Sequence, residues 1–122
     1  MKRVNNEQDE FEISFYEGIL NNKPDFLEAL IALGDLYTRN GHYEKGLKVD
    51  QKLEVLCPDD PVILYNLACS YSLLNRLDES LTIVKRAVKL GYDDFDHMQD
   101  DSDLDNLRKD SRFQKFMQRV TK

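Results

Sequence analysis

The fold of this 122-residue chain is decided by two consecutive stretches, LEALIALGDLYTRNGHYEKGLKVDQKLEVLCPDD (residues 27–60) and PVILYNLACSYSLLNRLDESLTIVKRAVKLGYDD (residues 61–94). The second overlays the first when the chain is shifted by 34 residues. The matched positions are mostly apolar or turn positions: Leu30 and Leu64, Leu33 and Leu67, Gly34 and Ala68, Tyr37 and Tyr71, Leu47 and Leu81, Leu56 and Leu90. Because packing constrains such positions, the overlay predicts one structural unit that occurs twice.

Apolar residues recur at helical spacing through both stretches and through residues 7–22. In residues 7–22 they are Phe11, Phe15, Ile19 and Leu20. No segment alternates with the period of two that a half-buried strand shows. The breaks between segments are short, and helices of about 14 residues joined by such turns pack as antiparallel neighbours. The sequence therefore predicts an all-α chain of antiparallel helix pairs.

Particular residues at the breaks predict where helices begin and end. We expect Asp25 to cap the helix that follows Pro24, and Pro61 to lie in the first turn of its helix. Gly41 and Asn75 tolerate a left-handed backbone, which is a common way to end a helix.

A 34-residue period of helix, turn and helix resembles the tetratricopeptide repeat (TPR) family. The residues that carry the resemblance are Leu30, Leu33, Gly34, Tyr37, Gly46 and Pro58 in residues 27–60, and Leu64, Leu67, Ala68, Tyr71, Ser80, Val84 and Ala87 in residues 61–94. Residues 7–22 are similar to the second helix of a preceding repeat. The resemblance implies an α-α superhelix, or solenoid. Asp50 stands where the family has a large apolar residue, so we expect it to face solvent or to pair with a cation such as Arg39.

The chain departs from the repeat after residue 94, and its tail resembles the end-of-group segment seen at the end of TPR arrays. The matching residues are Gly91, Tyr92, Asp96, His97, Met98, Asp101, Asp103, Leu104, Leu107, Arg108, Arg112, Phe113 and Phe116. We expect a divergent helical cap over residues 95–122 that covers the last repeat with Phe113, Phe116, Met117 and Val120. Residues 1–122 are thus predicted to form a single TPR-like domain: a lone helix at 7–22, repeats at 27–60 and 61–94, and the cap.

The tail also holds seven aspartates between Gly91 and Asp105, with no Lys or Arg among them. Asp101, Asp103 and Asp105 have the spacing of the first ligands of an EF-hand. Asn106 replaces the glycine of that loop, and Arg112 replaces its bidentate glutamate, so calcium binding is disfavoured. Helix capping is the more ordinary role, and Ser102 or Asp103 is the expected N-cap.

The sequence predicts a chain that is not an enzyme and that holds no metal or cofactor. Its two cysteines and two histidines, Cys57, Cys69, His42 and His97, match no usual zinc spacing, and no nucleophile elbow or phosphate loop is present. The net charge of -6 disfavours nucleic acid as a partner. No apolar run approaches the roughly 20 residues of a membrane helix. Two cysteines make no disulfide framework, so a cytoplasmic location is expected.

The resemblance to TPR proteins implies a concave groove that binds a peptide segment. The corresponding positions are Glu28, Ile31, Asp35 and Thr38 in the first full repeat, and Val62, Tyr65, Asn66, Cys69 and Ser72 in the second. TPR domains that hold acidic chaperone tails have Lys and Asn where this chain has Ile31 and Asp35, so that partner is not expected. A protein or peptide with an apolar anchor and a Lys or Arg would complement the groove. The alternative for Tyr65 is that it only covers neighbouring helices.

The function predicted from these residues is that of a non-catalytic protein–protein interaction module or scaffold. The alternative is a self-association or assembly module, or a regulatory fragment of a larger TPR protein. In that alternative Phe11, Phe15 and Ile19 of the first helix dock on a second copy, as a weak homo-oligomer, or on upstream repeats.

Overall fold

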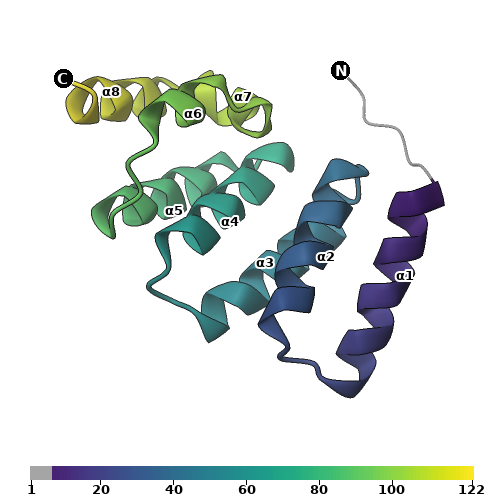
Figure 1. Cartoon of the computed structure of the whole chain (residues 1–122). Helices are drawn as coiled ribbons and strands as arrows, with labels where there is room; N and C mark the ends of the chain where they lie inside the picture. The colour runs from purple at the N-terminus through teal and green to yellow at the C-terminus, as the bar shows by residue number, and fades with distance from the viewer. Residues whose placement is uncertain (1–6) are drawn as a thin grey trace. The chain divides into compact units, whose positions relative to one another are not determined.

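A computed structural model of the protein describes residues 7–122, in which every regular element is a helix (Figure 1). The elements in chain order are α1 (Glu7–Asn22), α2 (Leu27–Arg39), α3 (Tyr43–Leu56), α4 (Pro61–Leu73), α5 (Leu77–Lys89), α6 (Phe95–Asp100), the 3-10 helix η1 (Ser102–Leu104), α7 (Asp105–Arg108) and α8 (Ser111–Val120). The predicted all-α fold is confirmed. Of the predicted domain, residues 1–6 lie outside the described part.

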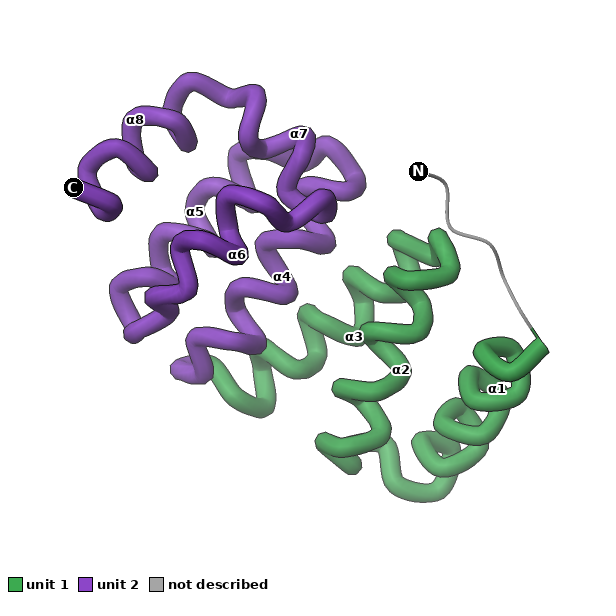
Figure 2. The backbone as a smooth tube through the Cα atoms, turned by 45° about the horizontal axis from the view of Figure 1, so that its top comes forward, with its two compact units in different colours: residues 1–58 green, residues 59–122 purple. Residues whose placement is uncertain are grey.

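The chain divides into two compact units, Met1–Pro58 and Asp59–Lys122 (Figure 2). The border falls in the turn between α3 and α4, two residues before the predicted boundary between the two repeats. In the first unit α2 packs against both α1 and α3. In the second unit α4 packs against α5, and it also contacts η1 and α7 of the tail. The predicted pairing of consecutive helices is therefore present in both units.

The pair α2 and α3 packs closely because two glycines leave room for it. A Cβ atom on Gly46 would lie 2.8 Å from Oγ1 of Thr38, and a Cβ atom on Gly34 would lie 3.1 Å from Oδ1 of Asp50. Buried leucines and a tyrosine fill the space on either side: Leu30, Leu33, Leu36, Tyr37, Leu47 and Leu53. The small positions of the predicted repeat thus have the close contacts that explain them.

Asp50 is buried on α3, so the expectation that it faces solvent is wrong. Gly34 provides the physical reason, since the absence of a side chain there leaves room for the Asp50 carboxylate. Arg39, the cation suggested for it, forms ion pairs with Asp9 and Asp35.

The second unit has a core that is built jointly by the repeat and the tail. Leu64, Ala68, Val84 and Ala87 of the repeat are fully buried. The tail contributes a comparable set of buried side chains to the same cluster: Met98, Leu104, Leu107, Phe113, Phe116 and Met117. Val120 packs against this cluster and is partly buried. The predicted covering of the last repeat by Phe113, Phe116, Met117 and Val120 is confirmed.

The helix boundaries confirm some of the predicted signals and correct others. Asp60 caps α4 by accepting from the backbone N–H of Val62 at 2.9 Å, and Pro61 lies in the first turn as predicted. The residue before α2 is Phe26, which makes no side-chain cap. Asp25 therefore does not cap α2, and it forms an ion pair with Lys52 at 3.3 Å.

The left-handed residues and the N-caps of the tail likewise agree with some of the predictions and differ from others. Gly41 and Asn75 have φ of +82° and +59°, as predicted for helix ends. The caps of α6, η1 and α8 are Asp94, Asp101 and Asp110, each accepting from a backbone N–H. Capping by the acidic run is confirmed, but neither Ser102 nor Asp103 is the N-cap, because η1 begins directly after Asp101.

Candidate functional site

The predicted groove residues of the first unit lie along one face of α2. Glu28, Ile31, Asp35 and Thr38 are spaced by three or four residues, so they are neighbours on the helix surface. Ile31 is 48% exposed although it is apolar, and Glu28 and Asp35 are exposed beside it. Leu27 adds further exposed apolar surface at the start of the helix. This face therefore offers an apolar centre between two carboxylates.

One of these carboxylates belongs to an ion-pair network at the end of α2. Nη1 of Arg39 lies 3.0 Å from Asp35. Nη2 and Nε of the same guanidinium donate to the two oxygens of Asp9 on α1, at 2.9 Å and 3.1 Å. Asn40 donates to Asp9 as well, at 2.9 Å. These bonds, with that of Arg39 foremost, lower the pKa of Asp9. The network joins α1 to α2 and offsets part of the charge of Asp35.

The predicted groove residues of the second unit divide into two groups. Val62 and Asn66 of α4 are exposed, whereas Tyr65, Cys69 and Ser72 are buried. The tail covers the buried three. Oγ of Ser72 accepts from the backbone N–H of Leu107 at 3.2 Å, and the Ser72 carbonyl accepts from Nδ2 of Asn106 at 2.9 Å. The chain's own tail therefore closes this part of the α4 face.

Tyr65 lies at the centre of the contact between α4 and the tail. Its hydroxyl donates to Oδ2 of Asp101 at 2.6 Å, and its ring stacks on Tyr92 with a centroid distance of 4.2 Å. The same Asp101 oxygen lies 3.2 Å from Nε2 of His97 and 3.7 Å from Sγ of Cys69. The position of Tyr65 agrees with the alternative interpretation, in which it covers neighbouring helices.

The raised pKa values of Tyr65, Cys69 and Tyr92 are typical of groups in a buried structural contact. Burial raises the pKa of the Tyr65 hydroxyl and that of the Cys69 thiol, and it raises the pKa of Tyr92 to about 12. A thiol of raised pKa is a poor nucleophile, because the thiolate is the reactive form. The cluster therefore connects α4 to the tail and is not set up for nucleophilic chemistry.

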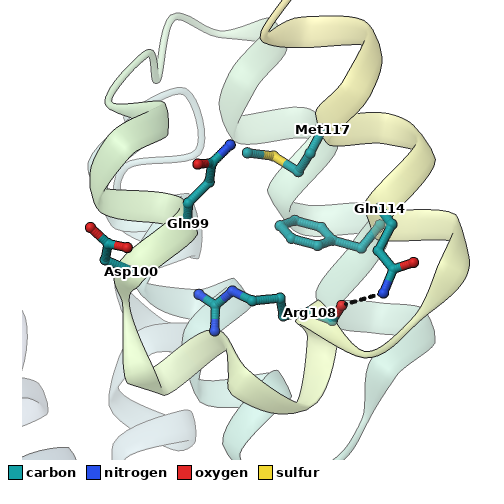
Figure 3. A pocket seen from close by; sticks show the side chains of 6 residues that line it. Gln99, Asp100, Arg108, Gln114 and Met117 are labelled. Carbon is teal, nitrogen blue, oxygen red and sulfur yellow. Dashed lines mark hydrogen bonds between the residues drawn. The ribbon is translucent and has the colours of Figure 1, made fainter.

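Sequence reasoning missed a pocket of about 390 Å³ in the second unit (Figure 3). Its lining comes from α6, α7 and α8: Gln99, Asp100, Arg108, Phe113, Gln114 and Met117. Arg108 is held in place by the carbonyls of Met98 and Asp101, to which Nη2 donates at 2.9 Å and 2.8 Å. Three short helices that lack the repeat pattern build this pocket, so no periodic signal pointed to it.

Over residues 7–122, the structure brings no three His, Cys, Asp or Glu side chains into a cluster that would hold a metal ion. Asp101 and Asp105, considered above as calcium ligands, bind Tyr65 and Arg108 respectively. Among the helices that the structure describes, none has the length and apolar character to cross a membrane.

Comparison with known proteins agrees with this architecture. Residues 62–91, which include most of α4 and all of α5, match the family model described as tetratricopeptide repeat. The match supports a TPR protein. The TPR repeat indicates a protein–protein interaction module.

One relative of this chain is a protein from Arabidopsis thaliana that is named as chloroplastic. The two are 36% identical over an alignment of 83 residues, which covers 63% of this chain and 24% of the relative. The chain thus spans about a quarter of the relative's length. Because the relative's name places it in the chloroplast, the cytoplasmic location expected from the cysteines of this chain stays a prediction.

Proposed function

We propose that this chain is a non-catalytic interaction module or scaffold whose partner binds along the exposed face of α2. The observation that carries the proposal is Ile31, which is 48% exposed in the middle of that face, between Glu28 and Asp35. A large apolar side chain within a polar rim is the usual anatomy of a peptide-binding surface. The partner segment would supply an apolar anchor for Ile31 and a Lys or Arg for the carboxylates.

On α4, fewer of the predicted groove residues remain open to a partner than the sequence alone suggested. Val62 and Asn66 stay open to a partner, since both are exposed. Tyr65, Cys69 and Ser72 are left out of the proposed site because the tail already occupies that surface. Displacing the tail would expose side chains that are fully buried on both sides of the contact, such as Leu104 of the tail and Leu64 of α4, so the tail serves as part of the core rather than as a removable lid.

Self-association through α1 is the weaker alternative. Phe11 and Phe15 are exposed, as that alternative requires. However, residues 7–22 carry five carboxylates and no Lys or Arg. Two copies that met through this helix would bring like charges together, which opposes association.

The proposed site is tested by titrating the chain with synthetic peptides that carry one Leu or Phe and a Lys or Arg three or four residues away. Ile31→Asp should weaken binding at least about tenfold, because it places a charge at the apolar centre. Val55→Asp is the matched control, since Val55 is 79% exposed on α3 of the same unit.

Asp35→Lys should also weaken binding of the basic peptides, since it replaces attraction by repulsion. Calorimetry gives the affinities. If Ile31→Asp and Val55→Asp bind every peptide as the parent does, the α2 face is not the binding site.

A further inference from the structure

The outer side of α1 presents a stripe of exposed residues. Phe11 and Phe15 are 66% and 54% exposed, and Gly18 follows three residues later on the same side of the helix. The opposite side faces α2, because Asp9 binds Arg39 and Glu17 accepts from the Tyr37 hydroxyl. We call Phe11, Phe15 and Gly18 the α1 stripe.

The repeat itself shows what kind of surface this stripe is. Shifting by 34 residues places Phe15 on Val49 and then on Ile83. Val49 lies against Gly34 of the paired helix α2, where its Cγ1 is 3.3 Å from the position of an added Cβ. Ile83 packs against the core of the second unit. Both equivalents are therefore covered by packing that Phe15 lacks, and α1 presents a surface of the type that receives a helix.

Gly18 is a second and independent sign of a partner. A Cβ atom at this position would meet no heavy atom of the described residues within 4 Å, so no packing within residues 7–122 requires a glycine. The equivalent positions of the two repeats hold Lys52 and Arg86, which favour a helix. Glycine in a helix interior is unfavourable relative to alanine. A glycine beside two exposed phenylalanines would let the backbone of a partner come close to α1.

The charge of α1 indicates the chemistry of that partner. Glu7 and Glu10 are exposed beside the stripe, and residues 7–22 contain no Lys or Arg. A second copy of the same helix would be repelled, whereas a helix with flanking Lys or Arg would be attracted.

We propose that the α1 stripe is a docking site for an amphipathic helix of a partner protein whose apolar stripe is flanked by Lys and Arg. The two phenylalanine rings anchor the apolar side of that helix, and Gly18 lets its backbone come close. The exposed carboxylates select the basic flanks. This site is separate from the proposed site on α2.

The proposal is tested with two designed helical peptides that share a leucine stripe, one with Lys and Arg on its flanks and one with Glu. Calorimetry with the full chain should show binding of the basic peptide and none of the acidic one. The double variant Phe11→Ser, Phe15→Ser should weaken that binding at least about tenfold. The titrations are carried out in the Ile31→Asp variant, in which the proposed site on α2 is weakened, so that binding to the α1 stripe is measured separately from binding to α2.

Gly18→Gln gives a readout that a purely structural role would not move. It should raise the midpoint of thermal unfolding, because glutamine favours a helix, and at the same time weaken peptide binding. The proposal is overturned if the basic peptide fails to bind, if the acidic peptide binds equally well, or if either variant binds as the parent does. Light scattering that shows a dimer of the parent, abolished by Phe11→Ser, Phe15→Ser, would overturn it in favour of self-association.

Discussion

Asp101 connects three parts of the second unit through a single carboxylate. One oxygen accepts from the Tyr65 hydroxyl of α4, and the other accepts from the backbone N–H of Asp103 and so caps η1. His97 of α6 lies within ion-pair distance. A residue that the acidic run suggested as a calcium ligand is in fact the polar link between the repeat and its tail. Hydrogen bonds to a charged acceptor of this kind are stronger than those between neutral groups.

Tyr65→Phe tests this link by removing one hydroxyl while keeping the ring that stacks on Tyr92. We expect the free energy of unfolding to fall by about 1–3 kcal/mol, because Asp101 loses a short hydrogen bond. Urea unfolding measures the change, with Tyr43→Phe in the first unit as control. An unaltered unfolding midpoint for Tyr65→Phe would show that the bond contributes nothing to stability.

Asp9 carries a prediction about pH. Its pKa in the folded chain lies below the ordinary value of 3.8, because Arg39 and Asn40 bind the carboxylate. The stabilisation is therefore present above pH 3.8 and is lost as the pH falls below that value. Asp9→Asn should be less stable than the parent at neutral pH, and the difference should shrink in acid below the ordinary pKa. Thermal unfolding across this range, with Glu10→Gln as control, checks it; a difference that is constant with pH would contradict the assignment.

At the scale of the element, glycine has opposite roles in α1 and α3. Gly46 is needed because α2 approaches it, with Thr38 Oγ1 only 2.8 Å from the position of a Cβ. Gly18 has open space above it. The pattern of the repeat explains Gly46, which matches Ser80 after a shift of 34 residues, but it does not explain Gly18.

These two glycines should therefore respond to substitution in opposite directions. Gly18→Ala should stabilise the chain by about 0.5–1 kcal/mol, because alanine favours a helix and meets no neighbour. Gly46→Leu should destabilise it by about 1–3 kcal/mol, because the added atoms force α2 and α3 apart. Thermal unfolding of both variants measures the two changes. Destabilisation by Gly18→Ala would mean that α1 is not an exposed helix as described.

At the scale of the whole molecule, the sequence predicted the repeat and the apolar cap that covers it, but it missed the polar contacts between the tail and α4. Gly34, Gly46 and Leu64 could be placed because periodic packing imposes residues of similar size and polarity at equivalent positions. The tail has no second copy to compare with, and its bonds to α4 join residues far apart in sequence, such as Ser72 and Leu107. The groove assignment of Tyr65 came from family resemblance, which does not include how this tail packs.

Asp50 shows a different limit of prediction from the sequence. Its position in the repeat was identified correctly as one for a large apolar residue, and the position is buried. Of the two expectations for this carboxylate, that it faces solvent or that it pairs with a cation, the first failed, because the neighbouring Gly34 leaves room for it. Patterning predicts which positions are buried, whereas the fate of a polar residue at such a position depends on its particular neighbours.

The closure of α4 by the tail is the claim on which the choice of binding surface depends, and the two cysteines test it. Cys57 at the end of α3 is half-buried, whereas Cys69 is buried beside Asp101. In a Cys57→Ser variant, we expect the remaining thiol to react with a thiol reagent only as fast as the protein unfolds, so that its rate rises with urea. In a Cys69→Ser variant, the remaining thiol should react quickly without urea. Rapid labelling of Cys69 in the folded chain would contradict the closure and return the α4 face to the binding surface.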